Sequence, residues 1–402
     1  MHRLQHDKRG SVYAFTSELD AWRDSRRQLL VAEPSDSAPT PGAGRRRVIW
    51  WLAAAAAVML TVSLTGYWAL SRPPAAQATA TPNPEAVRLV QLAYFAGNPG
   101  RVQIETGIRY YQDAIRLDPN YAPAWAGLAT AHLALTWFAE VPPSETMLRA
   151  KSEAQQALRL DPSAGPPWKV LAFVSHYHDW DHPKAETEFH KAIELGPRDA
   201  GARSWYGDFL VDLRRFDEAR VAYRQAQDVS PRWLEPTAFA GNAHLFSGNP
   251  DLAIVEYRRT LQSEPNFGLG SHFLGRAYLA KGWHDQAVEQ LRRSNDLLGK
   301  VPFAIGDLGH ALAVAGKRAE AESLVADLIA RRERGYYPAF AIAAIRLGLG
   351  DAEGALDWLE RAADERHMGF YMPSVDPTYD SVRSHPRFKA ILSRARLPGS
   401  AP

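Results

Sequence analysis

The sequence predicts an all-α fold in which about eight helical hairpins stack into a solenoid. Two adjacent stretches, 198–231 and 232–265, are each 34 residues long, and each closes on a proline. Within the first stretch, Ala219, Tyr223 and Ala226 are spaced to share one face of a helix, and the second stretch repeats the spacing. One hairpin cannot bury such a face alone, so we expect an array of stacked hairpins.

The interval pattern resembles the tetratricopeptide repeat (TPR), a family of stacked helical hairpins. The pattern residues are Gly207, Ala219, Tyr223, Ala226 and Pro231, which fall against Gly241, Ala253, Tyr257, Thr260 and Pro265. The resemblance implies a right-handed TPR solenoid over residues 85–378. The hairpins close at prolines or their equivalents, which are Pro119, Pro162, Pro197, Pro231, Pro265, Gly299 to Pro302, Pro338 and Pro377.

Composition excludes several classes of protein. The chain of 402 residues is 46% hydrophobic and 23% charged, which fits neither a disordered polymer nor a protein embedded wholly in a membrane. The repeat region carries no net basic charge, which argues against a general affinity for nucleic acid. Because there is no cysteine, disulfides, thiolate metal sites and cysteine nucleophiles are all excluded.

Residues 1–31 are predicted to be a short cytoplasmic segment. A β-like run at 12–15 precedes a helical pattern that includes Leu19 and Trp22. These residues, together with the basic turn before them, resemble the last part of an excisionase-type winged helix. In that family the recognition helix lies upstream, so the resemblance implies either a truncated DNA-binding domain or a true start further upstream. A basic tail with a chance match is the alternative.

Residues 32–47 are interpreted as a basic linker and residues 48–70 as a transmembrane helix. The second stretch is 23 residues long and uncharged, so as a helix it could cross a bilayer. The arginines at 45–47 orient its amino terminus toward the cytoplasm. A cleaved signal peptide is the alternative, although the apolar run is long and begins late. Residues 71–84 follow as a Pro/Ala spacer.

The predicted location is therefore the inner (cytoplasmic) membrane, crossed once, with the TPR domain periplasmic or otherwise extracytoplasmic. Residues 379–402 are predicted to be a C-terminal capping helix and tail. The string at 379–388 resembles the closing segment of bacterial membrane-bound TPR proteins fused to winged-helix or other output modules. That resemblance implies a cytoplasmic output module, an anchor and an outward-facing TPR domain.

One cluster has the composition of a metal site. His176, His178 and His182, with Asp179 and Asp181, come close to the ligand run of metallo-β-lactamase folds. The run is one residue too long, and it lies at a predicted helical turn without the strands of that fold. Phosphate-loop, zinc-protease and hydrolase motifs are missing from the sequence. We therefore predict no metal site, no catalytic residues and no cofactor.

A groove is the expected binding feature. In TPR folds the first helices of successive hairpins line the concave face, and such a surface suits an extended peptide or a helix. The resemblance places eight residues there: Asp208, Val211, Asn242, Leu245, Phe246, His272, Arg276 and His310.

The sequence thus predicts a non-enzymatic, membrane-anchored TPR scaffold that binds a protein or peptide partner through this groove. The alternative is a membrane-bound transcriptional regulator or sensor with a truncated N-terminal DNA-binding domain, which would bind DNA. A third hypothesis, a metal-dependent hydrolase at the histidine cluster, would require stoichiometric zinc.

Overall fold

The structure is a computed structural model. It describes residues 2–4, 12–14, 81–95, 101–138 and 141–397. The chain divides into two units, Met1–Ala80 and Thr81–Pro402.

The first unit contains a small β-hairpin. Strands β1 (His2–Leu4) and β2 (Val12–Ala14) pair in antiparallel fashion, with His2 opposite Ala14 and Leu4 opposite Val12. The β-like run predicted from the sequence coincides with β2. The helix expected after it lies outside the described residues, so the winged-helix resemblance gains no support.

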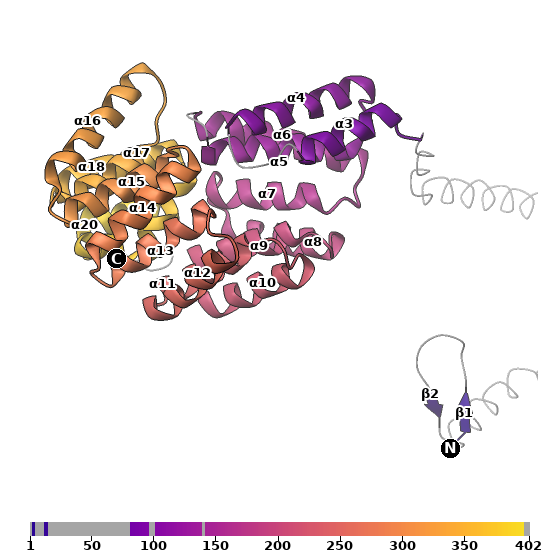
Figure 1. The fold of residues 1–402 in the computed structure, drawn as a ribbon. Helices are drawn as coiled ribbons and strands as arrows, with labels where there is room; N and C mark the ends of the chain where they lie inside the picture. Colours follow the sequence, from indigo (N-terminus) through magenta and orange to yellow (C-terminus); the bar gives the residue numbers. More distant parts are fainter. Residues whose placement is uncertain (1, 5–11, 15–80, 96–100, 139–140, 398–402) are drawn as a thin grey trace, which may run out of the picture. The chain divides into compact units, whose positions relative to one another are not determined.

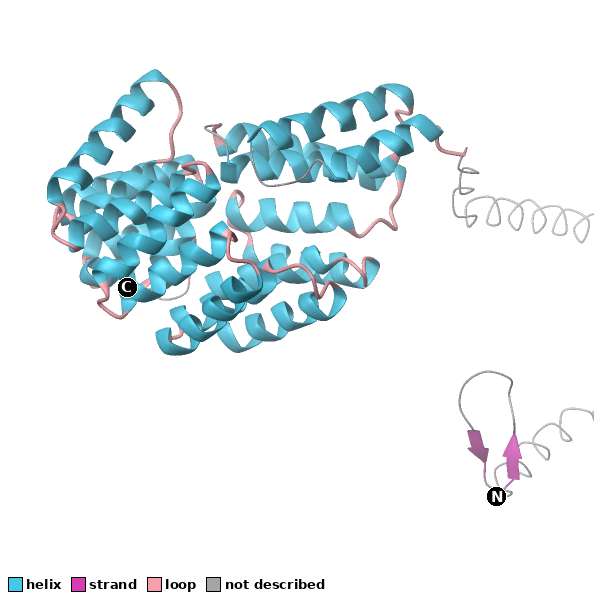
Figure 2. Cartoon of the chain, in the orientation of Figure 1, coloured by secondary structure: helices cyan, strands magenta, loops and turns pink. Residues whose placement is uncertain are grey.

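The second unit is an all-α, TPR-like helical solenoid (Figures 1 and 2). Its helices α3 to α18 follow one another as eight hairpins in the described residues. The first four hairpins are α3 (Pro84–Phe95) with α4 (Arg101–Leu117), α5 (Ala122–Phe138) with α6 (Pro143–Leu160), α7 (Pro166–Tyr177) with α8 (His182–Leu195), and α9 (Ala200–Asp212) with α10 (Phe216–Val229). The next four are α11 (Glu235–Phe246) with α12 (Pro250–Ser263), α13 (Gly268–Ala280) with α14 (His284–Leu298), α15 (Pro302–Val314) with α16 (Arg318–Arg334), and α17 (Ala339–Gly348) with α18 (Ala352–Glu365).

Local sequence explains where many of these helices begin. Proline occupies the first turn of several, including α6, α8 and α12, where its missing N–H is not needed. Asp181, Asp199 and Asp351 cap α8, α9 and α18 by accepting hydrogen bonds from backbone N–H groups in the first turn. Each cap satisfies a donor that the helix itself cannot.

The turn inside the hairpins follows a strict period. One residue with positive φ recurs every 34 positions from the third hairpin to the eighth, at Trp180, Arg214, Gly248, Gly282, Gly316 and Gly350. Glycine adopts this left-handed conformation without the steric cost that other residues incur. Six consecutive hairpins therefore share one turn geometry, and the last four use the residue best suited to it.

A glycine in the first helix lets the two helices of a hairpin approach closely. A Cβ atom on Gly207 would lie 2.5 Å from the ring of Tyr223, and one on Gly241 would lie 2.4 Å from the ring of Tyr257. Both rings are almost completely buried. The recurring glycine of the first helix and the recurring tyrosine of the second helix thus contact each other directly.

The chain continues after α18 through three short elements and a last helix. These are η2 (Met368–Tyr371), α19 (Met372–Val375), η3 (Pro377–Val382) and α20 (Pro386–Arg394). Helix α20 packs against α18 (Figure 1) and buries Phe388, Ile391 and Leu392. At its rim Arg387 pairs with Glu353 at 2.7 Å. This pair is exposed and contributes little, so the apolar contacts hold α20 in place.

The predicted membrane anchor requires a correction. In the described part of the chain no helix is both long enough and apolar enough to cross a membrane. The longest helix there, α6, is interrupted by charged residues such as Arg149 and Glu153. Residues 48–70, where the transmembrane helix was expected, lie outside the described residues. What the described residues support is a TPR-like helical solenoid without the preceding transmembrane helix, and the single-pass inner-membrane location with a periplasmic TPR domain is not supported.

The glycine–tyrosine contact predicts opposite outcomes for two glycine-to-alanine changes. Gly241→Ala pushes a methyl group into a fully buried ring whose hydroxyl is held by Asn242, so we expect a net loss of about 1 kcal/mol or more of stability. Gly107→Ala, in α4, meets its nearest atom at an ordinary 3.5 Å and should gain up to about 1 kcal/mol from helix propensity. Urea unfolding followed by circular dichroism measures both. Equal effects of the two changes would contradict the close-contact interpretation.

Candidate partner-binding surface

The eight predicted groove residues all lie on first helices of hairpins. Asp208 and Val211 are on α9, Asn242, Leu245 and Phe246 on α11, His272 and Arg276 on α13, and His310 on α15. Asp208 is half-buried and the other seven are buried. Four of them, at 208, 242, 276 and 310, occupy the same position of successive 34-residue repeats. These four residues form one row of equivalent positions.

The first two members of the row are satisfied inside their own hairpins. Tyr223 donates a hydrogen bond from its hydroxyl to Asp208 at 2.7 Å, and Tyr257 donates to Asn242 at 2.6 Å. Burial raises the pKa of Asp208 to about 8, although the hydrogen bond from Tyr223 opposes that rise. Both side chains therefore help to hold the two helices of a hairpin together.

The row continues with a cation. Arg276 forms an ion pair with Asp376, and the side chains of both residues are only 7% exposed. Its Nε lies 3.4 Å from Asp307, which in turn lies 3.2 Å from Nε2 of His272. Burial alone would raise the pKa of Asp307, but the neighbouring Arg276 and His272 hold it below its usual value. The guanidinium therefore sits between two carboxylates.

His310 completes the row, and its Nδ1 lies 2.9 Å from the carbonyl oxygen of Ala344 on the next first helix, α17. The apolar members Val211, Leu245 and Phe246 belong to a buried cluster that also contains Val375 of α19. The predicted residues thus all lie on first helices, but seven of the eight are buried and so do not line an open groove.

The surface is covered by the chain's own C-terminal segment, defined here as residues 366–383. Tyr371 donates a hydrogen bond to the carbonyl oxygen of His176 at 2.5 Å, and Arg214 donates to the carbonyl oxygen of Ser374 at 3.0 Å. His367 Nε2 donates a hydrogen bond to the carbonyl oxygen of Thr136 at 3.1 Å. These contacts reach the first helices α5 and α7 and the turn that follows α9. The segment therefore follows the array across several hairpins.

Sequence reasoning missed this covering, because residues 379–402 were interpreted as a cap for the last hairpin and residues 366–378 as part of the array. One signal was available. Residues 368–379 are rich in aromatic and aliphatic side chains. Such a composition favours a buried segment over a second helix ending at solvent.

Two residues of the predicted histidine cluster, His176 and His182, form a hydrogen-bonded chain with Asp212 and the carbonyl oxygen of Ala395. His176 Nε2 lies 3.1 Å from Asp212, His176 Nδ1 lies 3.0 Å from His182 Nδ1, and His182 Nε2 lies 2.7 Å from the carbonyl oxygen of Ala395. Within the residues described, no group of three potential ligands is placed to hold a metal ion.

The carbonyl oxygen of Ala395 at the end of this chain determines which atom donates in each of its hydrogen bonds. A carbonyl oxygen can only accept, so His182 Nε2 carries a proton and its Nδ1, in the neutral ring, accepts one from His176. Nε2 of a neutral His176 must then accept from Asp212, which has to be protonated. Burial supports this assignment, because it lowers the pKa of His176 to about 3 and raises the pKa of Asp212 to about 7. The cluster is a neutral structural link to the C-terminus.

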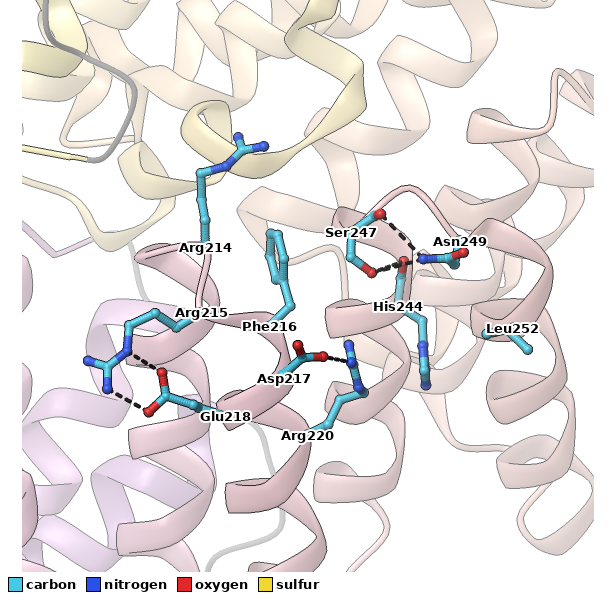
Figure 3. A pocket seen from close by; sticks show the side chains of 10 residues that line it. All are labelled: Arg214, Arg215, Phe216, Asp217, Glu218, Arg220, His244, Ser247, Asn249 and Leu252. Atoms are coloured by element: carbon cyan, nitrogen blue, oxygen red, sulfur yellow. Dashed lines mark hydrogen bonds and ion pairs between the residues drawn. The ribbon is translucent and has the colours of Figure 1, made fainter.

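An open pocket of about 460 Å³ lies beside the covered surface (Figure 3). It is formed by the α9–α10 and α11–α12 turns and their neighbouring helices, and it contains none of the predicted groove residues. Arg215 pairs with Glu218 at 2.7 Å, and Arg220 pairs with Asp217. Most charged side chains of the pocket are therefore already paired with one another, and few remain to bind a charged ligand.

Comparisons with known proteins agree with the helical-repeat fold. The family described as tetratricopeptide repeat matches residues 181–232, which supports a TPR protein. No curated protein matches the sequence.

Solved structures give weak likenesses. Pseudomonas aeruginosa PilF is 20% identical, with a TM-score of 0.40, and the match covers 52% of this chain and 91% of that chain. A thermophilic TPR protein of Thermus thermophilus is 18% identical with a TM-score of 0.40, covering 48% and 99%. YrrB, described as a TPR protein with an unusual peptide-binding site, is 22% identical with a TM-score of 0.29, covering 46% and 90%. These scores are too low to carry an argument about a partner.

The protonated state of Asp212 predicts a distinct pH dependence. The folded chain keeps this proton up to about pH 7, whereas the unfolded chain releases it at about pH 4, so the wild type loses stability as pH rises between those values. Asp212→Asn preserves a donor toward His176 and has no proton to lose. We expect the folding equilibrium constant of Asp212→Asn, divided by that of the wild type, to rise roughly tenfold per pH unit between about pH 5 and 7.

Urea unfolding at several pH values measures this difference, with Asp380→Asn as a control for losing an exposed carboxylate. If the stability of Asp212→Asn relative to the wild type instead stays constant between about pH 5 and 7, Asp212 is ionised in the folded protein over that range, and the hydrogen-bond directions assigned above are wrong.

Proposed function

We propose that this chain is a non-enzymatic protein-interaction scaffold that binds an extended segment of a partner protein along the first helices of its hairpins. The predicted row at Asp208, Asn242, Arg276 and His310 is the centre of that surface. The proposal concerns only the helical array, and it assigns no membrane or DNA partner.

One observation carries the proposal: the first helices already hold a short, irregular peptide segment. Arg214 donates to the backbone of Ser374, and Arg276 pairs with Asp376. Contacts to backbone carbonyls position a chain regardless of its sequence, while side-chain contacts select among sequences. A surface with both kinds of contact is suited to recognising a peptide.

The proposed absence of catalysis is supported by how the buried ionisable groups are used. Asp208 accepts from Tyr223, Asp212 belongs to the histidine chain, and Asp307 lies between Arg276 and His272. Each of these carboxyl groups is engaged by a neighbouring side chain. None of these three carboxyl groups is left aimed into the open pocket beside the array.

Site-specific photo-crosslinking tests the location of the surface. A photoreactive amino acid at Arg214, whose side chain points toward the C-terminal segment (Figure 3), should crosslink to partner proteins in the native cell extract. The matched control is Val255, which is 60% exposed on the second helix α12. We expect at least about tenfold more crosslinked partner from Arg214 than from Val255, because only the former borders the first-helix surface.

Mass spectrometry identifies the crosslinked peptides, and circular dichroism confirms that both variants remain helical. Equal crosslinking at the two positions, or crosslinking at Val255 alone, would contradict binding through the first helices.

A further inference from the structure

The C-terminal segment is anchored first by aromatic rings. Phe370 and Tyr371 are essentially completely buried. The ring of Tyr371 lies 4.4 Å from that of His176 and 4.9 Å from that of Tyr177, measured between centroids. Both partners are on α7. Large buried aromatic side chains of this kind typically dominate the energy of a peptide interface.

A carboxylate provides the second anchor, five residues after Tyr371. Asp376 pairs with Arg276, whose guanidinium also lies 5.2 Å from the ring centre of Phe246. Arg276 is nearly inaccessible to water, so an uncharged residue in place of Asp376 would leave the guanidinium paired only with Asp307. The surface therefore selects a negative charge at this point.

The segment has little regular structure of its own. Between Arg366 and Arg383 its longest element is η3, with 6 residues, and α19 has only 4. Its path is instead set by contacts with the array, including bonds from Arg366 to the backbone of His178 and from Arg214 to the backbone of Ser374. A different chain with the same two anchors could follow the same path, because the array supplies the shape.

We propose that the first-helix surface recognises a partner segment carrying an aromatic residue followed, five residues later, by a carboxylate, and that residues 366–383 are the resident occupant that such a partner replaces. This inference rests on the proposed function and specifies its ligand. The aromatic residue docks against His176 and Tyr177, and the carboxylate docks on Arg276.

A synthetic peptide with the sequence of residues 366–383 is the probe. It is labelled with fluorescein and titrated into the full-length chain, wild type or with the resident anchors removed by Tyr371→Ala and Asp376→Ala. Fluorescence anisotropy reports binding. Hydrogen exchange of residues 366–383 reports whether the resident segment has left, and circular dichroism reports whether the helices persist.

The emptied variant should bind the peptide at least about tenfold more tightly than the wild type does, because the resident segment competes at a high effective concentration. A peptide carrying Asp376→Asn should bind at least about tenfold more weakly, since it leaves Arg276 without that charged partner. The matched control peptide carries Asp380→Asn. Asp380 has a side chain 64% exposed, so this peptide should bind like the original.

The proposal is overturned if the emptied variant remains helical and exchanges freely at 366–383 yet does not bind the peptide. It is overturned as well if residues 366–383 stay protected in that helical variant, because the segment is then not a replaceable occupant. It is also overturned if the peptides with Asp376→Asn and Asp380→Asn bind equally. If the double variant loses its helices, the full-length chain with Asp376→Asn alone is titrated with the same peptides. Equal binding of the Asp376→Asn and Asp380→Asn peptides to that chain also overturns the proposal. A wild-type dimer that the peptide dissociates would instead assign the surface to the C-terminal segment of a second copy.

This experiment separates the inference from the broader function. A partner that crosslinks at Arg214 and is not displaced by excess peptide would leave the scaffold function standing and reject the ligand class. Peptide binding without any crosslinked partner would support the recognition chemistry and reject the scaffold function.

Discussion

The structure depends on the buried ion pair between Arg276 and Asp376. In the two preceding hairpins the equivalent positions are Asp208 and Asn242, and a tyrosine of the same hairpin satisfies each. The hairpin of Arg276 has Leu291 where those hairpins have Tyr223 and Tyr257, so it offers no hydroxyl. A buried guanidinium without a partner is strongly destabilising, and the carboxylates that satisfy it come from the next hairpin and from the C-terminal segment.

This pairing changes the character of the array. In an ordinary solenoid each repeat contacts only its neighbours, and stability is nearly a sum of local terms. Here one buried apolar cluster contains Leu133 of the second hairpin, Ile345 of the eighth and Tyr371 of the C-terminal segment. Hairpins far apart in sequence therefore share a core. Such contacts increase the sequence separation of the native contacts, which couples distant repeats and slows their folding.

The hairpins could be predicted from the sequence because their signals are local. The recurring glycine, tyrosine and proline spacing records contacts made within 34 residues, as between Gly241 and Tyr257. The placement of candidate residues on first helices could be predicted for the same reason. The covering of those residues could not, because Arg276 and Asp376 are 100 residues apart and no periodicity connects them. The left-handed turn glycines recur every 34 residues from Gly248 to Gly350, so they too are a local signal of the hairpins.

The polar contacts along the surface have a role that apolar packing cannot fill. Apolar side chains such as Val375 and Phe370 would be buried almost equally well if the segment shifted along the array, since hydrophobic burial has little directional preference. The ion pair at Asp376 and the hydrogen bonds that join Tyr371 to His176 and Arg214 to Ser374 would all break on such a shift. Each unpaired group left behind would add a desolvation penalty. The apolar contacts therefore supply most of the attraction, and the polar contacts define the single register in which the segment lies.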